Sequence, residues 1–173
     1  LTAKGIAAQA AYDVTRDSPA GKCVAYPTPT FLGVPYLNEI TLTEDRMTIK
    51  GELFGSERVI YTDGRDHPQG GDYTNQGHSI GYWEGEVLVV ETAQLAEHRS
   101  ALIDGVPMGT SRHVVERFSL SDDGRRLLID FVVEDPEYLA EPFAGSMEWD
   151  YAPQFRFIPI DCDPEISTKP WEE

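Results

Sequence analysis

The stretch from Arg112 to Glu134, RHVVERFSLSDDGRRLLIDFVVE, decides the fold class of this chain. Two runs rich in β-branched and aromatic residues, Arg112–Leu120 and Arg125–Glu134, flank the tetrapeptide SDDG at positions 121–124. Ser, Asp and Gly are common in turns. The Ser and Asp side chains hydrogen-bond to the local backbone, and Gly tolerates positive φ. The stretch therefore predicts an antiparallel β-hairpin.

Similar strand signals continue on both sides of this hairpin. They cover Leu37–Thr43, Arg46–Phe54, Glu57–Asp63, His78–Trp83, Glu86–Thr92 and Ser146–Ile160. Roughly eight strands in mostly adjacent antiparallel pairs normally close into a barrel or a sandwich, because either arrangement removes exposed sheet edges. We predict an all-β fold, an antiparallel meander closing into a lipocalin-like barrel, since such a barrel leaves room for one small ligand.

The remaining segments add little regular structure to residues 1–173, which we expect to form one domain. The alanine-rich start, TAKGIAAQAAYDV, predicts a short N-terminal helix. Prolines and glycines between Thr15 and Pro35 exclude a long helix, so this span is predicted to be an irregular arm. The interior has at most a turn near Ala93–Ala101.

The composition excludes several classes of partner. Thirty acidic residues against fourteen basic ones give a formal net charge of −16. Such a surface repels phosphate backbones and anionic lipids, so neither nucleic acid nor a membrane surface is expected as a partner. No apolar run has the length of about 20 residues that crosses a bilayer as a helix.

Two cysteines, Cys23 and Cys162, lie near opposite ends of the sequence. Their spacing does not fit a metal or thioredoxin-like motif. In an oxidising compartment they would form a disulfide, and a chain that starts at Leu1 fits a mature form whose leader has been removed. We therefore expect an exported protein, periplasmic or extracellular; the alternative is a cytosolic protein with two buried thiols.

The segment from Arg58 to Thr92 carries the densest set of chemically useful side chains. Tyr61, Asp63, Arg65 and two histidines, His67 and His78, lie within eighteen positions of one another. Histidine is the side chain best suited to move protons near neutral pH. This segment is therefore the strongest candidate for a site.

Strand alternation adds Glu116 to the candidates, because it shares one face of its strand with apolar Val114 and Phe118. A carboxylate at such a position is either a general acid or base in a cavity, or half of an ion pair with Arg58 or another arginine. If Val59 marks the inner face of its strand, Tyr61 and Asp63 enter the same interior.

An aromatic wall is predicted on the last strand. Its members are Trp149, Tyr151, Phe155 and Phe157. Such a wall is either plain core or the lining of a pocket for a flat, apolar ligand.

Other site chemistries find no support in the spacing of residues. His67, His78 and His113 show no HxH or HExxH spacing, so no metal is expected, and His98 is expected on the surface. There is no GxSxG or SxxK nucleophile motif and no nucleotide fingerprint. An enzyme of this sequence would therefore perform acid–base chemistry without an organic cofactor.

The segments YTDGRDHP, HSIGYWEGEVLVVET and RHVVERF resemble the motifs of a family of small exported bacterial proteins, mostly hypothetical ones. The family pattern runs DGRxHP, GHSIGxWEGDTLVVDT and HVxERY, and the likeness covers nearly the whole chain. The matched signature positions are Asp63, Gly64, Arg65, His67, Pro68, His78, Ser79, Trp83, Glu84, Gly85, His113, Glu116 and Arg117. The resemblance implies export and a β-barrel, without a settled activity. Tyr82 stands where the pattern has arginine, which puts an anion-binding role of that position in question.

The leading functional hypothesis is an exported β-barrel enzyme, a lyase or isomerase acting on a small aromatic or apolar molecule. His78 and Glu116 would be the proton-transfer pair, with Asp63 and Tyr61 orienting or donating. Arg65 would hold an anionic group. Trp83 and the aromatic wall would pack against the substrate.

Two alternatives stay open at this point. The first is a lipocalin-type binding protein in which the same groups only orient a ligand. The second is a structural module in which the DGRDHP and WEGE segments stabilise loops. In each case strand edges would allow a homodimer.

Overall fold

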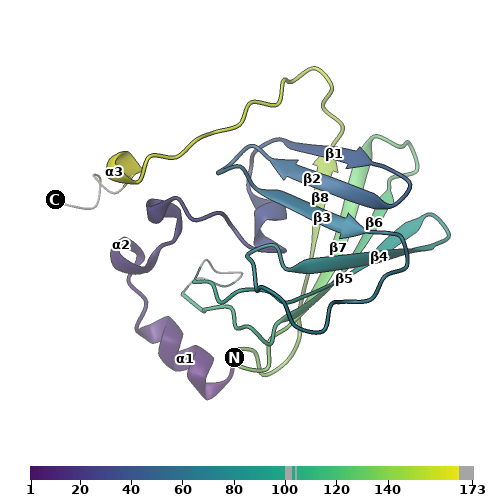
Figure 1. Ribbon diagram of the computed structural model, residues 1–173. Coiled ribbons are helices and arrows are strands. Elements are labelled where there is room, and N and C mark those ends of the chain that lie inside the picture. The colour runs from purple at the N-terminus through teal and green to yellow at the C-terminus, as the bar shows by residue number, and fades with distance from the viewer. Residues whose placement is uncertain (100–102, 104, 168–173) are drawn as a thin grey trace.

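The computed structural model describes residues 1–99, 103 and 105–167. In this part of the chain, eight strands form one sheet whose spatial order is the order of the sequence (Figure 1). The strands are β1 Asn38–Leu42, β2 Arg46–Gly51, β3 Glu57–Tyr61, β4 His78–Glu84, β5 Val87–Ala93, β6 His113–Leu120, β7 Arg126–Glu134 and β8 Phe143–Asp150. The predicted turn near Ala93–Ala101 lies partly outside the described residues, and positions 94–99 form no helix.

Short helices lie at the two ends of the chain. They are α1 Ala3–Ala10, α2 Val14–Asp17 and α3 Pro164–Ser167, with 3-10 turns η1 Ala20–Lys22 and η2 Thr30–Gly33. Thr2 caps α1 by accepting a 3.0 Å hydrogen bond from the Gly5 amide. The predicted N-terminal helix and irregular arm are therefore confirmed, and in the described residues no helix is long and apolar enough to cross a membrane.

The sheet curls into a half-barrel, which confirms the all-β, lipocalin-like fold class (Figure 1). Seven pairings connect neighbouring strands from β1 to β8, and the described ladders contain none between β1 and β8. The two edges of the sheet therefore bound an open side of the half-barrel.

One pairing departs from the predicted antiparallel meander. Strands β3 and β4 run parallel over a short ladder, with Ile60 opposite Ser79 and Tyr61 opposite Ile80. Parallel neighbours need a crossover connection rather than a tight turn, and the polar loop at positions 62–77 supplies it. The loop carries the chain back to the start of β4, where the ring of His78 stacks on that of Tyr61.

The concave face of the sheet holds the core. One cluster gathers Met47, Ile49, Ile60, Leu88, Val90, Phe118 and Ile129 with Phe31 and Leu32 of the arm. A second cluster of Leu95, Val114, Phe131 and Val133 packs beside it. Both clusters use alternate residues of each strand, as a half-buried sheet requires.

The inner face of β3 is the opposite of the one expected. Arg58 and Ile60 are buried there, whereas Val59 and Tyr61 are only half-buried. The expectation that Val59 marks the inside is therefore wrong. Buried Arg58 made the true alternation hard to recognise, since an arginine is a rare inward residue.

The last strand is shorter than predicted. β8 ends at Asp150, so Tyr151, Phe155 and Phe157 belong to an irregular segment instead of the run Ser146–Ile160. Pro153 and Pro159 have no N–H to donate to a sheet ladder, which explains the early end.

The C-terminal segment is tied to the domain at two places. Ile160 exchanges backbone hydrogen bonds with residues 52 and 54, at 2.7 and 3.1 Å. Two residues further on, Cys162 is bonded to Cys23 of the arm, with a Cα–Cα distance of 5.5 Å. The expected disulfide thus joins the two terminal segments on one side of the sheet (Figure 1).

Candidate functional site

The concave face opens into a groove of about 980 Å³. It lies between β1 and β8, the two edges that the half-barrel leaves apart. Its apolar lining includes Leu32, Val34, Ile40, Leu42, Met47, Leu88, Phe118, Leu120, Leu127 and Met147. Ligand pockets typically measure about 300–1,000 Å³ and are mostly apolar, so the groove has the size and character of a small-molecule site.

Four residues predicted to bind substrate, Trp83, Trp149, Tyr151 and Phe155, line this groove together. Trp83 comes from β4 in the middle of the sheet, Trp149 comes from the edge strand β8, and the last two come from the segment after β8. Trp83, Tyr151 and Phe155 are 53%, 73% and 64% exposed, so their rings are free to cover a ligand. The aromatic wall is therefore a lining and not a filled core.

Trp149 is the fixed member of this wall. Its indole Nε1–H donates a 2.9 Å hydrogen bond to the carbonyl of Leu32 in the arm. Because this hydrogen bond already fixes the orientation of the ring, a ligand that stacks on it costs little additional side-chain entropy.

One polar group of the groove lacks a partner. Asn38 lies on the inner face of β1, and its side-chain oxygen is buried without a hydrogen-bond donor among the described residues. A buried acceptor without a donor is destabilising. This oxygen lies beside Gly51 of β2 and is not at the accessible surface of the groove.

The predicted catalytic residue Glu116 lies deeper in the same face, in an ion pair with Arg58. Arg58 Nη1 donates to Glu116 Oε1 at 2.8 Å, and Nη2 bonds the second carboxylate oxygen. Arg58 also donates to the hydroxyls of Ser79, at 3.1 Å, and Thr92, at 2.8 Å. The ion pair weighed as the alternative reading of Glu116 is thus present, and both carboxylate oxygens are occupied.

Of the other predicted catalytic residues, Tyr61 and His78 lie on the convex face, and Asp63 lies in the loop after β3. His78 stacks on Tyr61 with ring centroids 5.4 Å apart. The guanidinium group of Arg65 also lies over the Tyr61 ring, with its central carbon 3.7 Å from the ring centroid. Strand alternation places His78 one residue from inward Ser79, so the sheet separates His78 from Glu116. The two therefore do not form a direct proton-transfer pair.

His67 takes the position beside His78 instead. The two Nδ1 atoms are 2.8 Å apart, so one imidazole donates and the other accepts. Burial lowers the pKa of His67, against the attraction of Glu91, and burial with His67 and Arg65 nearby lowers the pKa of His78. Both rings are thus favoured as neutral bases near pH 7.

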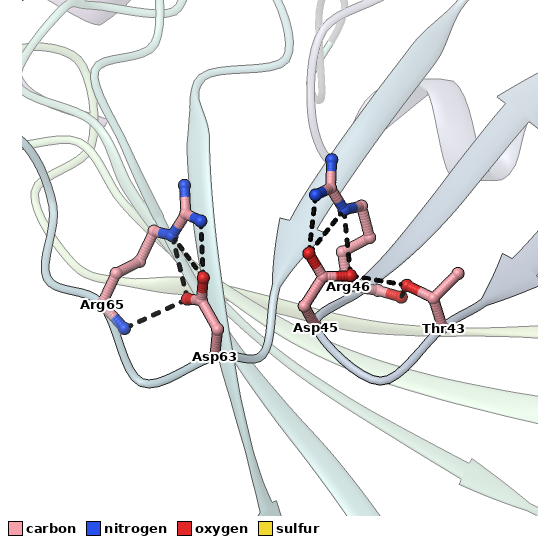
Figure 2. A network of polar contacts seen from close by, with 5 residues as sticks. All are labelled: Thr43, Asp45, Arg46, Asp63 and Arg65. Atoms are coloured by element: carbon pink, nitrogen blue, oxygen red, sulfur yellow. Dashed lines mark hydrogen bonds and ion pairs between the residues drawn. The ribbon is translucent and has the colours of Figure 1, made fainter.

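Asp63 is connected to this cluster through its ion pair with Arg65. Figure 2 shows the Asp63–Arg65 pair beside the Asp45–Arg46 pair of the neighbouring loop. The two loops are joined by a 2.8 Å hydrogen bond from the Thr62 amide to the Asp45 carbonyl. The Arg65 guanidinium holds the pKa of Asp63 below its ordinary value, so this carboxylate stays charged and acts as an anchor for Arg65.

No group of three or more His, Cys, Asp or Glu side chains in the described ranges is arranged to hold a metal ion. His98, expected on the surface, is buried, and its ring Nε2 lies 3.1 Å from the Ala25 carbonyl. Sequence reasoning missed Asn38 and the Leu32–Leu37 wall of the groove. The alternate positions of Asn38, Ile40 and Leu42 in the sequence could have indicated that Asn38 shares a face of its strand with the two apolar residues.

Comparisons of the chain with protein-family models, with curated proteins and with solved structures returned no match. The motif resemblance therefore stays a prediction, and the function is inferred from the geometry of this chain.

Proposed function

We propose that the protein binds a small, flat, apolar molecule in the groove between β1 and β8. The observation that carries this proposal is the meeting of Trp83, Trp149, Tyr151 and Phe155 around one space of about 980 Å³. Stacking on several aromatic faces favours a planar ligand.

This proposal accounts for the groove better than catalysis there does. Glu116 faces Arg58 with both oxygens bonded, and its neighbours Ser79 and Thr92 bond each other at 2.8 Å. The acidic residues that do line the groove, such as Glu39 and Glu86, are exposed. Exposed carboxylates are solvated and orient a ligand's polar end more readily than they abstract its protons.

A fluorescence titration with the neutral dye N-phenylnaphthylamine tests the proposal. We expect saturable binding by the wild type, and affinity at least about tenfold weaker for Trp83→Ala, since one lost aromatic contact removes about 1.4 kcal/mol or more. Tyr82→Ala is the matched control, because Tyr82 neighbours Trp83, is 49% exposed and points to the other face. Equal affinity for both variants would contradict the proposal.

A separate observation favours a second function on the convex face. The Nδ1 atoms of His67 and His78 lie within hydrogen-bond distance, at 2.8 Å, beside Tyr61 and Arg65. We propose that this cluster performs cofactor-independent acid–base chemistry of the lyase or isomerase type. His78 would act as the base with His67 as its partner, and Arg65 would hold an anionic group.

Deuterium exchange tests this second function. A panel of small aromatic and apolar carbonyl compounds is incubated in D₂O with the wild type, and carbon-bound deuterium is followed by mass spectrometry. The proposal predicts incorporation that His78→Phe abolishes and Tyr82→Phe leaves unchanged. Incorporation of equal extent with His78→Phe would contradict it.

We also propose export to an oxidising compartment, periplasmic or extracellular. The bond between Cys23 and Cys162 supports it, because structural disulfides form and persist in such compartments. Fractionation of the source cells with immunodetection tests it: detection only in the cytosol would contradict export.

A further inference from the structure

Arg112 is a buried arginine that no other side chain satisfies. It immediately precedes β6 and is only 2% exposed. Its Nε, Nη1 and Nη2 atoms are all buried, and none has a hydrogen-bond partner in the described structure. All of its N–H donors are therefore unused.

Arg58 provides an internal comparison. It is equally buried, at 1% exposed, yet it donates to Glu116, Ser79 and Thr92. A buried charge without a counter-charge is strongly destabilising, whereas a paired and fully bonded one is tolerated. The chain thus satisfies the hydrogen-bond donors of Arg58 with its own residues, whereas the guanidinium donors of Arg112 have no partner among the described residues.

The surroundings of Arg112 form a hollow with about 10 Å³ of free space. Its walls are mostly apolar and include Ile103, Val106, Met108, Val133 and Leu139. Free space of this size accommodates about one water molecule or one small ion. A larger organic ligand does not fit inside it.

Among the described residues that line the hollow, Asp135 is the one carboxylate, and both of its oxygens already accept hydrogen bonds. Oδ2 accepts a 2.7 Å hydrogen bond from the Gly109 amide, and Oδ1 accepts one of 3.2 Å from the Glu137 amide. Burial lowers the pKa of Arg112 to about 10, with Asp135 acting in the opposite direction. Arg112 therefore remains charged near pH 7.

We propose that the hollow beside Arg112 is a binding site for a small inorganic anion, with chloride as its representative. The guanidinium of Arg112 offers unpaired N–H donors, and the one described carboxylate of the wall already accepts two hydrogen bonds, which favours an anion over a cation. A water molecule would bond the guanidinium without neutralising it, whereas an anion does both. This site lies apart from the groove and does not rest on the proposed binding function.

Thermal unfolding of the full, disulfide-bonded chain tests the proposal. Sodium chloride is titrated against sodium gluconate at constant ionic strength, because gluconate is too large for the hollow. We expect the Tm of the wild type to rise by about 3–5 °C for each tenfold increase in chloride above its dissociation constant. Arg112→Met is expected to remove this response, and Arg117→Gln, which changes an exposed arginine of β6, is expected to retain it.

A second measurement uses only the wild type, so that a folding defect in Arg112→Met leaves the test intact. Crystals grown with bromide in place of chloride are expected to show an anomalous peak at the guanidinium of Arg112. The proposal is overturned if the Tm of the wild type responds equally to chloride and gluconate. It is also overturned if bromide leaves the hollow empty while occupying other sites.

Discussion

Arg58 and Glu116 face each other on the concave side of the sheet, joined by two hydrogen bonds and almost completely removed from solvent. They belong to β3 and β6, which lie three places apart in the strand order. The pair therefore links strands that do not pair with each other, through Ser79 of β4 and Thr92 of β5.

Removal of this pair's negative half is expected to destabilise the fold strongly. Glu116→Gln leaves Arg58 buried without its counter-charge, and the free energy of unfolding should fall by about 3–5 kcal/mol. Urea denaturation measures the change. Glu84→Gln, which breaks the exposed pair with Arg117, is the control and should cost about 1 kcal/mol or less.

A double variant separates charge from packing at this position. Arg58→Met with Glu116→Leu removes both charges together, so it should be more stable than Glu116→Gln. If Glu116→Gln proves as stable as the wild type, the pair does not contribute to the fold as described.

The disulfide is expected to hold the aromatic segment against the groove. Tyr151 and Phe155 lie between β8 and Cys162, so bond removal frees one end of their segment. Cys23→Ser with Cys162→Ser should lower the free energy of unfolding by about 2–5 kcal/mol and weaken dye affinity several-fold. An unchanged affinity at a lowered Tm would mean that the segment is held by the Ile160 contacts alone.

The histidine pair predicts a pH dependence of stability. The folded pKa values of His67 and His78 lie below the ordinary value, so the unfolded chain binds more protons as pH falls through about 6.5. The contribution of these two rings to the free energy of unfolding is therefore fully present above that pH, and it decreases as the pH falls below it. The carboxylates with lowered pKa, such as Asp63, lose their contribution only at lower pH.

Chemical denaturation at about pH 7 and pH 5 measures this dependence. The difference between the two free energies should be larger for the wild type than for His67→Gln, which keeps a polar side chain without titrating. The same difference in both proteins would contradict the lowered pKa values.

Trp149 should contribute to both stability and binding. Trp149→Phe removes the hydrogen bond to Leu32 and keeps an aromatic ring, so the free energy of unfolding should fall by about 1 kcal/mol or somewhat more. Dye affinity should fall less for Trp149→Phe than for Trp149→Ala. Equal affinities for the two variants would show that the ring does not contact the ligand.

The sequence predicted strands best where a period-two pattern lies between strong turn residues, and less well at β8, whose predicted range extended ten residues too far. The hairpin around Asp122 and Asp123 shows this, since β6 and β7 match the expected ranges to within a residue. The parallel β3–β4 pairing was not predictable in the same way. Its crossover loop, positions 62–77, has the same turn-rich composition as a long hairpin loop.

The candidate site was predicted in part, and the reason lies in the faces of the strands. Tyr61, Asp63, Arg65 and His78 come together because they are close in the sequence and share one end of the sheet. Glu116 was assigned to them because Arg58, a buried charge, disguised the inner face of β3. The ion pair with Arg58 was one of the two alternatives for Glu116, and the sequence left the choice open because it depends on a contact between residues 58 positions apart.

The central claim is that the concave groove is the ligand site. Its most direct test is an NMR chemical-shift map of the isotope-labelled protein titrated with N-phenylnaphthylamine. We predict that the indole Nε1–H resonances of Trp83 and Trp149 shift and saturate together, while the ring resonances of His67 and His78 stay in place. Saturable shifts confined to the histidine rings, with both indoles unmoved, would contradict the account.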